Sequence, residues 1–245
     1  MPTIQPDEPP SELPEVEAGR LPDRYRDRMQ DQFLARALPR LRPGVRILDV
    51  GAGRAPTLAP KTRPTGCWYV GTDRSAEELD AAPPGAYDET IVSDVTEPFP
   101  RADRFDLVLS WQVLEHVGDV GDALRQMGEC VVPGGLLLVQ TSGSRAVFSV
   151  ASRMMPHRAR VFAMERLLGV PAEEKFPTTR QPKTEASLRA ALTGFSSVDV
   201  LPFYRGAAYF RFSRALQRLY VVYEDWAAAD RRPDLATHYL VAATR

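Results

Sequence analysis

The sequence predicts an α/β fold in which helices cover both faces of a doubly wound, seven-stranded sheet. From residue 21 onward, short apolar runs alternate with stretches of helical periodicity. The runs are apolar at successive positions, which is typical of strands that are buried on both faces. A chain of 245 residues with 44% hydrophobic content is long enough to bury such a core.

The predicted elements follow one another in a regular order. An amphipathic helix over 23–41 comes first, because its apolar residues recur at steps of three and four. Strands are expected at 45–50, 67–73, 90–94, 105–111, 135–142, 196–203 and 238–245. Helices are expected at 75–82 and 120–132, and Pro133-Gly134-Gly135 predicts a turn after the second of them.

The composition excludes several classes of protein. Lys and Arg number 31 against 32 Asp and Glu, so the net charge of -1 gives no general reason to bind nucleic acid. Cys67 and Cys130 lack the paired spacing of a zinc site and are too few for a disulfide framework, so no metal site is expected. The chain shows neither a transmembrane run nor a signal peptide, which favours a cytoplasmic location.

The first 20 residues differ in composition from the remainder. They are rich in proline and in acidic residues, and are too polar to pack a core. We therefore expect a disordered N-terminal arm over 1–20 and one domain over 21–245.

A glycine turn follows the first predicted strand, in the stretch VRILDVGAGRAP. Gly51 and Gly53 allow a sharp turn and a close approach of the backbone to a ligand. The carboxyl ends of strands are where open α/β sheets bind ligands. A dinucleotide fingerprint needs a third small residue at position 56, where this chain has Pro56.

Two carboxylates follow the next two strands. Asp73 ends the second strand, where it could accept hydrogen bonds from both ribose hydroxyls. Asp94 ends the third strand and could receive the exocyclic amine of an adenine. For each carboxylate the alternative is an N-cap or a solvated turn residue. Together they indicate an adenosine cofactor without phosphates.

Five motifs occur in order at the expected strand ends: DVGAG, the acidic end of the second strand, SDV, FDLVLSWQVLEHV and VVPGGLLLV. Over about residues 40–142 they resemble the motifs of class I S-adenosylmethionine-dependent methyltransferases. The resemblance implies a Rossmann-like sheet that is mostly parallel with an antiparallel last strand, S-adenosylmethionine as cofactor, and methyltransferase activity.

The resemblance also implies roles for particular residues. Asp49 would steady the glycine loop, Asp73 would hold the ribose, and Asp94 with the Val95 amide would bracket the adenine. The full cofactor set that it implies is Asp49, Gly51, Ala52, Gly53, Asp73, Arg74, Asp94, Val95, Ser110, Trp111 and Tyr25.

The fourth-strand motif indicates which class of molecule receives the methyl group, called the acceptor. It has SWQV in place of the Asp/Asn-Pro-Pro-aromatic sequence of amino-methylating nucleic-acid enzymes, and Glu115 alone in place of paired glutamates that would hold a guanidinium. VLEHV instead resembles the branch of the family that methylates small molecules such as quinones, lipids, sugars and polyketides. We expect a small-molecule acceptor, with oxygen favoured over nitrogen or carbon.

The catalytic candidate is His116, which follows the fourth strand close to the expected methyl group and could act as a general base. The alternative is a histidine that packs in the next turn. Gln112, His157 and Tyr204 are the expected substrate contacts, and His238 is expected to be structural.

Two insertions interrupt the predicted sheet. Residues of about 143–183 could form a helical cap over the pocket, and about 205–230 form a helical insertion. In the second insertion an apolar seam recurs at steps of three and four, formed by Tyr209, Phe212, Leu216, Leu219, Tyr223 and Trp226. We expect the seam to pack on the domain; a homodimer interface through 207–228 and a lipid contact are the alternatives. Arg211, Arg214 and Arg218 lie off the seam.

Two other functions fit a chain with this fold. A nicotinamide-dependent oxidoreductase would need dinucleotide binding, which Pro56 opposes. A non-catalytic protein with a methyltransferase fold would use its insertions for assembly and bind no cofactor.

Overall fold

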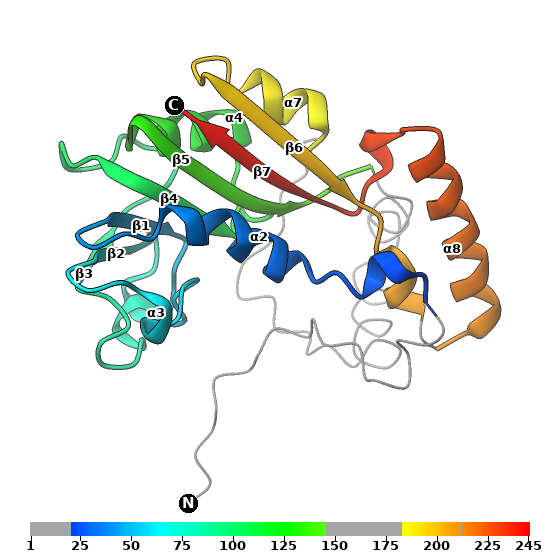
Figure 1. Ribbon diagram of the computed structural model, residues 1–245, viewed down its shortest axis with the longest axis horizontal. Coiled ribbons are helices and arrows are strands. Elements are labelled where there is room, and N and C mark those ends of the chain that lie inside the picture. The colour runs from blue at the N-terminus through cyan, green and yellow to red at the C-terminus, as the bar shows by residue number, and fades with distance from the viewer. Residues whose placement is uncertain (1–20, 146–182, 211) are drawn as a thin grey trace, which may run out of the picture.

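The computed structural model describes residues 21–145, 183–210 and 212–245. These residues form one seven-stranded sheet in the order β3-β2-β1-β4-β5-β7-β6, with helices on both faces (Figure 1). The predicted α/β fold class is therefore confirmed. The expected arm over 1–20 and most of the expected cap at 143–183 lie outside the described residues.

The strands closely match those expected. They are β1 (Arg46–Val50), β2 (Trp68–Asp73), β3 (Glu89–Val92), β4 (Phe105–Trp111), β5 (Val131–Ser142), β6 (Ser197–Phe203) and β7 (His238–Thr244). Strands β1 to β5 pair in parallel, and β7 is antiparallel to both β5 and β6. The predicted start of β5 at residue 135 is wrong, since the strand begins at Val131. Its Pro-Gly-Gly turn is instead absorbed into the strand, where the pairing with β4 shifts register.

The predicted helix over 23–41 is broken into η1 (Asp23–Tyr25), α2 (Met29–Ala37) and η2 (Leu38–Arg40). The cause of the first break is a contact across the chain. Arg205 donates from its guanidinium to the backbone oxygens of Tyr25 and Asp27, so these carbonyls bind a side chain. The amphipathic pattern could not reveal a partner 180 residues away.

The remaining helices are α3 (Ala76–Asp80), α4 (Val120–Glu129), α7 (Glu185–Ala190) and α8 (Arg214–Ala229), with short 3-10 turns η3 (Pro60–Thr62), η5 (Gly206–Phe210) and η6 (Pro233–Leu235). Helix α2 packs on one face of the sheet, whereas α4 and α7 pack on the other. Among the helices that the structure describes, none is long and apolar enough to cross a membrane.

No α-helix lies between β1 and β2, where every residue is described. The connection over residues 51–67 contains only η3. Pro56 and Pro60 account for this, since each proline lacks a backbone donor and its ring blocks a continuous helix. The ligand edge of β1 therefore meets a loop rather than a helix N-terminus.

Helix α8 corrects one expectation. Its buried residues are Gln217, Tyr220, Glu224 and Ala227, while four members of the predicted seam are exposed: Phe212, Leu216, Leu219 and Trp226. These four residues do not pack on the domain, whereas Tyr223 of the same seam packs against the buried cluster that contains Tyr25 and Tyr220. The sequence pattern failed here because the side of α8 that faces the domain is held by hydrogen bonds as well as by apolar contacts.

Glu224 is at the centre of these hydrogen bonds and is 1% exposed. Its carboxylate accepts from the Tyr25 hydroxyl and from the Gly206 backbone N–H, both at 2.5 Å, and lies 3.2 Å from the Arg24 guanidinium. The Tyr25 hydroxyl in turn accepts from the Ala207 N–H. One carboxylate thus joins η1, η5 and α8.

Glu224→Ala is expected to lower the free energy of unfolding by about 2 to 6 kcal/mol, because it leaves two buried donors, the Tyr25 hydroxyl and the Gly206 N–H, without an acceptor at about 1 to 3 kcal/mol each. Asp225→Ala is the matched control. Asp225 also pairs with Arg24 but is 56% exposed, so its loss should cost no more than about 1 kcal/mol. Urea denaturation measures both, and equal losses would contradict the central role of Glu224.

His238, at the start of β7, gives a second expected outcome. Burial, together with the nearby charge of Arg205, lowers the pKa of His238 to about 4. Between about pH 6.5 and about 4 the unfolded chain would bind a proton at His238 that the native state excludes. Stability should therefore fall as the pH falls through this window, by about 3 kcal/mol from this residue.

His238→Asn removes the titrating group and should flatten this part of the stability profile. Thermal unfolding of both proteins between pH 7 and pH 4 measures the difference. Parallel profiles for wild type and variant would show that His238 does not titrate as described.

Candidate functional site

A cavity of about 590 Å³ opens at the carboxyl edge of the sheet, beside the ends of β1 and β2. The loop after β1, the segment after β3 and the turn after β4 form its walls, and α4 closes one side. Of the residues expected to form the site, those that line it are Gly51, Gly53, Asp73, Arg74, Asp94, Val95, Gln112 and His116. The topology therefore brings together residues from four separate strand ends.

The glycine turn has the conformation that its sequence requires. Gly51 and Gly53 have φ values of +69° and +51°, in the left-handed region that favours glycine. A Cβ on Gly51 would lie 2.2 Å from Cγ2 of Val113, so any side chain there would collide with the turn after β4. The glycine keeps the backbone of β1 and the β4 turn in close contact at the cavity.

Asp49 is fully buried and does not line the cavity among the residues described. Its carboxylate accepts hydrogen bonds from the Thr57 N–H and hydroxyl, both at 2.7 Å, and from the Tyr69 hydroxyl at 2.6 Å. Burial raises the pKa of Asp49, and the three donors oppose that shift. These contacts tie Asp49 of β1 to Thr57 in the following loop and to Tyr69 of β2.

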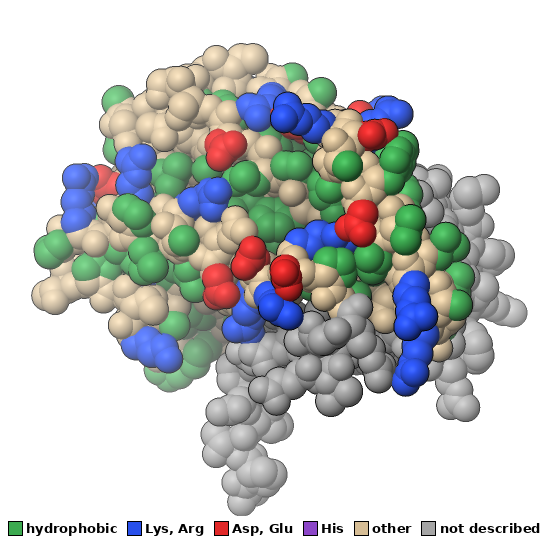
Figure 2. Space-filling view, turned by 45° about the vertical axis from the view of Figure 1, so that its right-hand side comes forward, with side chains coloured by type: hydrophobic (Ala, Val, Ile, Leu, Met, Phe, Trp, Pro, Cys, Tyr) green, Lys and Arg blue, Asp and Glu red, His purple; other side chains and the backbone are tan. Residues whose placement is uncertain are grey.

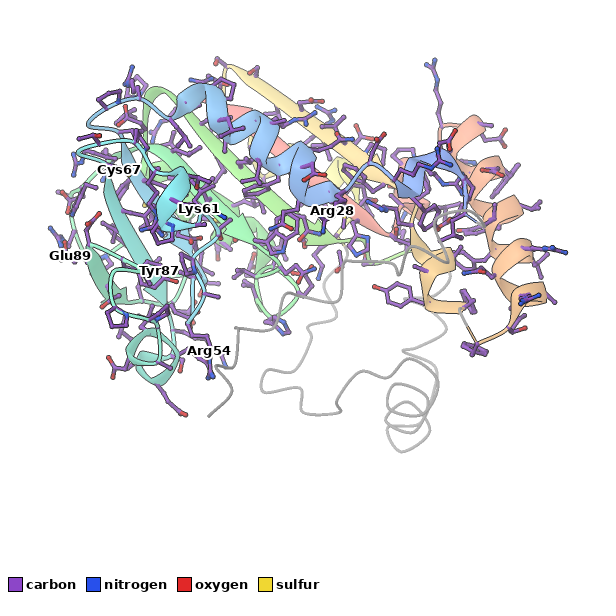
Figure 3. All side chains as sticks on the ribbon, turned by 60° about the horizontal axis from the view of Figure 1, so that its bottom comes forward. Arg28, Arg54, Lys61, Cys67, Tyr87 and Glu89 are labelled. Atoms are coloured by element: carbon purple, nitrogen blue, oxygen red, sulfur yellow. The ribbon has the colours of Figure 1, made fainter. Side chains whose placement is uncertain are left out.

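Tyr87 supports the same loop from the segment before β3 (Figure 3). Its hydroxyl donates to the backbone oxygens of Ala52 and Gly53 at 2.9 and 3.0 Å. The Ala52 N–H donates to the Thr72 oxygen. Ala52 therefore holds the loop through its backbone, and its side chain is buried away from the cavity.

Asp73 ends β2 with its carboxylate fixed by two backbone donors. The Gly53 N–H donates to Oδ2 at 3.2 Å, and the Ser75 N–H donates to Oδ1 at 2.9 Å. Each oxygen retains capacity to accept a further hydrogen bond. A fixed bidentate acceptor of this kind suits the two hydroxyls of a ribose.

Asp94 follows β3 in a turn that it stabilises itself. Its Oδ1 accepts from both the N–H and the hydroxyl of Thr96, at 2.9 and 2.7 Å. These hydrogen bonds from Thr96 hold the pKa of Asp94 below its usual value. The turn places Asp94 and Val95 together on the cavity wall.

The charge of the cavity distinguishes between classes of cofactor. Its described lining includes six carboxylates and one guanidinium, from Asp73, Glu78, Asp94, Glu97, Asp119, Asp122 and Arg74. Glu78 is paired with Arg54, labelled in Figure 3, through two hydrogen bonds of 2.7 Å. Carboxylates repel a pyrophosphate and attract a cation, and no helix N-terminus follows β1 to bind phosphate. The residues present fit an adenosine with a sulfonium group.

The turn after β4 brings two expected contacts to the cavity. Gln112 has a φ of +57°, which is uncommon for a residue with a side chain. His116 follows in the same turn, where its backbone N–H donates to the Val113 backbone oxygen at 3.0 Å. Both residues line the cavity.

Four other expected contacts lie away from the described lining of the cavity. Ser110 is buried within β4, and Trp111 packs edge-on against Phe33 of α2 at 5.1 Å. Tyr25 lies in the Glu224 hydrogen bonds. Tyr204 packs in the core with α4 and α7, where burial raises its pKa to about 12. His157 lies outside the described residues.

Sequence reasoning missed the part of the cavity that α4 forms. Asp119, Asp122, Gln126 and Met127 line this side. The sequence identified α4 as an amphipathic helix, but periodicity does not indicate which edge of a helix faces a ligand.

A second group that was missed consists of buried polar atoms at the same edge of the sheet. The Ser110 hydroxyl, both amide atoms of Gln140, the Thr141 hydroxyl and Nδ1 of His238 have no hydrogen-bond partner within the part of the chain described. A buried polar atom without a partner costs about 1 to 3 kcal/mol. These atoms come from the ends of β4 and β5 and the start of β7, which meet at the carboxyl edge.

The chain is similar to known proteins over most of its length. Residues 23–195 match the model of a family described as the methyltransferase domain. Two curated relatives are ubiquinone biosynthesis O-methyltransferases: that of Bradyrhizobium sp. (strain ORS 278) is 40% identical over 103 residues, and that of Rhodopseudomonas palustris (strain BisB18) is 36% identical over 102. Each match spans 40% of this chain and 40% of the relative.

Solved structures share the fold at low sequence identity. Phosphoethanolamine N-methyltransferase 2 of Haemonchus contortus, in complex with S-adenosyl-L-methionine, is 18% identical with a TM-score of 0.55, covering 88% of this chain and 52% of that one. An S-adenosylmethionine-dependent methyltransferase from Mesorhizobium loti is 20% identical with a TM-score of 0.54, covering 88% and 96%.

The family match covers well over half of the chain, and the matched residues carry the glycine turn, Asp73, Asp94 and His116. The chain belongs to the methyltransferase domain family, as a member of the class I S-adenosylmethionine-dependent methyltransferases.

Proposed function

We propose that the protein transfers a methyl group from S-adenosylmethionine to a hydroxyl oxygen of a small molecule. The observation that carries the proposal is one cavity that combines three features: a carboxylate suited to hydrogen bonds from ribose hydroxyls, an acidic lining and a histidine. Asp73, Asp94 and His116 line it together with the glycine turn. The named relatives, which are O-methyltransferases of ubiquinone biosynthesis, support an oxygen acceptor.

Asp73, Asp94 and the Val95 segment would hold the adenosine portion of the cofactor, with Gly51 and Gly53 against its methionine portion. The cofactor supplies an activated methyl group on a good leaving group. The protein then has to align the acceptor oxygen with that group, since positioning supplies much of the rate enhancement for such a transfer.

His116 would accept the proton of the acceptor hydroxyl as the oxygen attacks. It lines the cavity in the same turn as Gln112, which would contact the acceptor. The buried polar atoms of Ser110, Gln140 and Thr141 lie at the same edge of the sheet. None of the three lines the described cavity, so no role in the transfer is assigned to them.

The oxidoreductase alternative is disfavoured by the same features. The acidic lining and the absence of a helix after β1 both oppose a pyrophosphate. A non-catalytic role would require that no cofactor bind, which titration with S-adenosylhomocysteine tests.

Asp73→Asn should weaken the binding of S-adenosylhomocysteine about tenfold or more, because hydrogen bonds to a charged carboxylate contribute about 1.5 to 3 kcal/mol each. Calorimetric titration measures the effect. Asp88→Asn is the control: Asp88, like Asp73, accepts from a backbone N–H, in this case that of Tyr69, but it does not line the described cavity. This variant should therefore bind S-adenosylhomocysteine as the wild type does. Equal affinities for both variants would remove Asp73 from the cofactor site.

His116→Ala should lower kcat about 10² to 10⁴-fold, because it removes the general base. The affinity for S-adenosylhomocysteine should stay within about twofold, since this histidine is assigned to the acceptor and not to the cofactor. Methyl transfer from labelled cofactor to a panel of phenols, sugars and lipid hydroxyls provides the assay. Full turnover by the variant would assign His116 to packing alone.

A further inference from the structure

An apolar strip runs along the outer side of α8. Leu219 and Val222 are 67% and 64% exposed, and the other members are exposed to nearly half of their surface. The strip, called here the α8 strip, consists of Phe212, Leu216, Leu219, Val222 and Trp226. Figure 2 shows hydrophobic side chains gathered over this helix at the right of the molecule. Contiguous exposed apolar surface of this kind marks an interaction site.

The outward position of the strip is fixed by the opposite side of the helix. Glu224 holds that side to η1 and η5 through Tyr25, Arg24 and Gly206. Rotating α8 to bury the strip would break these buried hydrogen bonds. The apolar side is therefore a stable external surface rather than a loosely packed part of the core.

The charges beside the strip are unbalanced. Arg214 and Arg218 are exposed, lie one helical turn apart, and make no ion pair with any described residue. Asp225, on the same side of α8, is already paired with Arg24. Basic side chains gather over the amino-terminal half of the helix in Figure 2. The strip thus has uncompensated positive charge along its border.

This charge distinguishes between two partners that could cover the strip, a second copy of the chain and a lipid surface. In a two-fold dimer through the strip, residues at the centre of α8 would meet their own copies, so Arg218 beside the central Leu219 would approach another Arg218. Asp225, two turns further along α8, is held by Arg24, which limits how far it offsets this repulsion. Lipid phosphates, in contrast, would bind both arginines while the acyl region receives the apolar side chains.

We propose that the α8 strip, with Arg214 and Arg218, docks the protein on the surface of an anionic phospholipid bilayer. The helix lies in the plane of the interface, with Leu216, Leu219 and Trp226 directed into the boundary of headgroups and acyl chains. The proposal is independent of the methyl-transfer chemistry.

Sedimentation of the full chain with vesicles tests the proposal. The protein should bind vesicles of phosphatidylcholine with phosphatidylglycerol, bind weakly to phosphatidylcholine alone, and dissociate as the salt concentration rises. Leu219→Ser should weaken binding about tenfold through lost apolar burial. Arg214→Gln and Arg218→Gln should each weaken binding to the anionic vesicles about fivefold.

Two variants serve as matched controls. Leu38→Ser removes a leucine that is 52% exposed outside the strip, and Arg125→Gln removes an exposed arginine of α4. Both should bind vesicles as the wild type does. Every variant should retain its affinity for S-adenosylhomocysteine, which verifies that the domain is folded and separates this proposal from the proposed function.

Failure of the folded protein to bind anionic vesicles would overturn the proposal, as would unchanged binding by Leu219→Ser. A dimer in light scattering that Leu219→Ser dissociates would assign the strip to a second copy of the chain and would also overturn it.

Discussion

The buried carboxylate of Asp49 fixes the geometry on which the candidate site depends. Pro56 and Pro60 leave the connection after β1 without an α-helix, so packing of a helix cannot hold the glycine loop in place. Asp49 performs this task by accepting hydrogen bonds from Thr57 within the loop and from Tyr69 on β2. The loop then directs the Gly53 N–H at Asp73, which holds in place the carboxylate that we propose for the ribose.

The loss of that helix also determines which cofactor the edge of the sheet suits. A helix N-terminus offers backbone donors and a positive dipole to a phosphate, and the connection from β1 to β2 has none. The described cavity lining instead carries carboxylates in excess of cations. A neutral adenosine joined to a cationic sulfonium satisfies this electrostatic environment. At the other end of the domain a second buried carboxylate, Glu224, directs the apolar side of α8 away from the core.

The sequence was sufficient to predict the fold class, the strands and the residues at their carboxyl ends, because these depend on local apolar runs and on the topology of parallel sheets. Asp73, Asp94 and His116 could be placed in this way. Contacts between segments that are distant in the sequence could not be predicted. Arg205 interrupts the first helix by donating to the backbone oxygen of Tyr25. Glu224 holds the polar side of α8 against the domain, so that the apolar side is exposed. The hydrophobic pattern shows neither of these partners, so it did not indicate that four residues of the α8 seam are exposed. Tyr25, which the family resemblance assigns to the cofactor, lies outside the described cavity lining.

A crystal structure of the complex with S-adenosylhomocysteine is the most direct test of the central claim that this edge of the sheet holds an adenosine cofactor. The account requires both ribose hydroxyls within hydrogen-bond distance of the Asp73 carboxylate, the adenine against Asp94 and Val95, and the glycine turn against the homocysteine portion. Binding elsewhere, or an adenosine that does not touch Asp73, would contradict it.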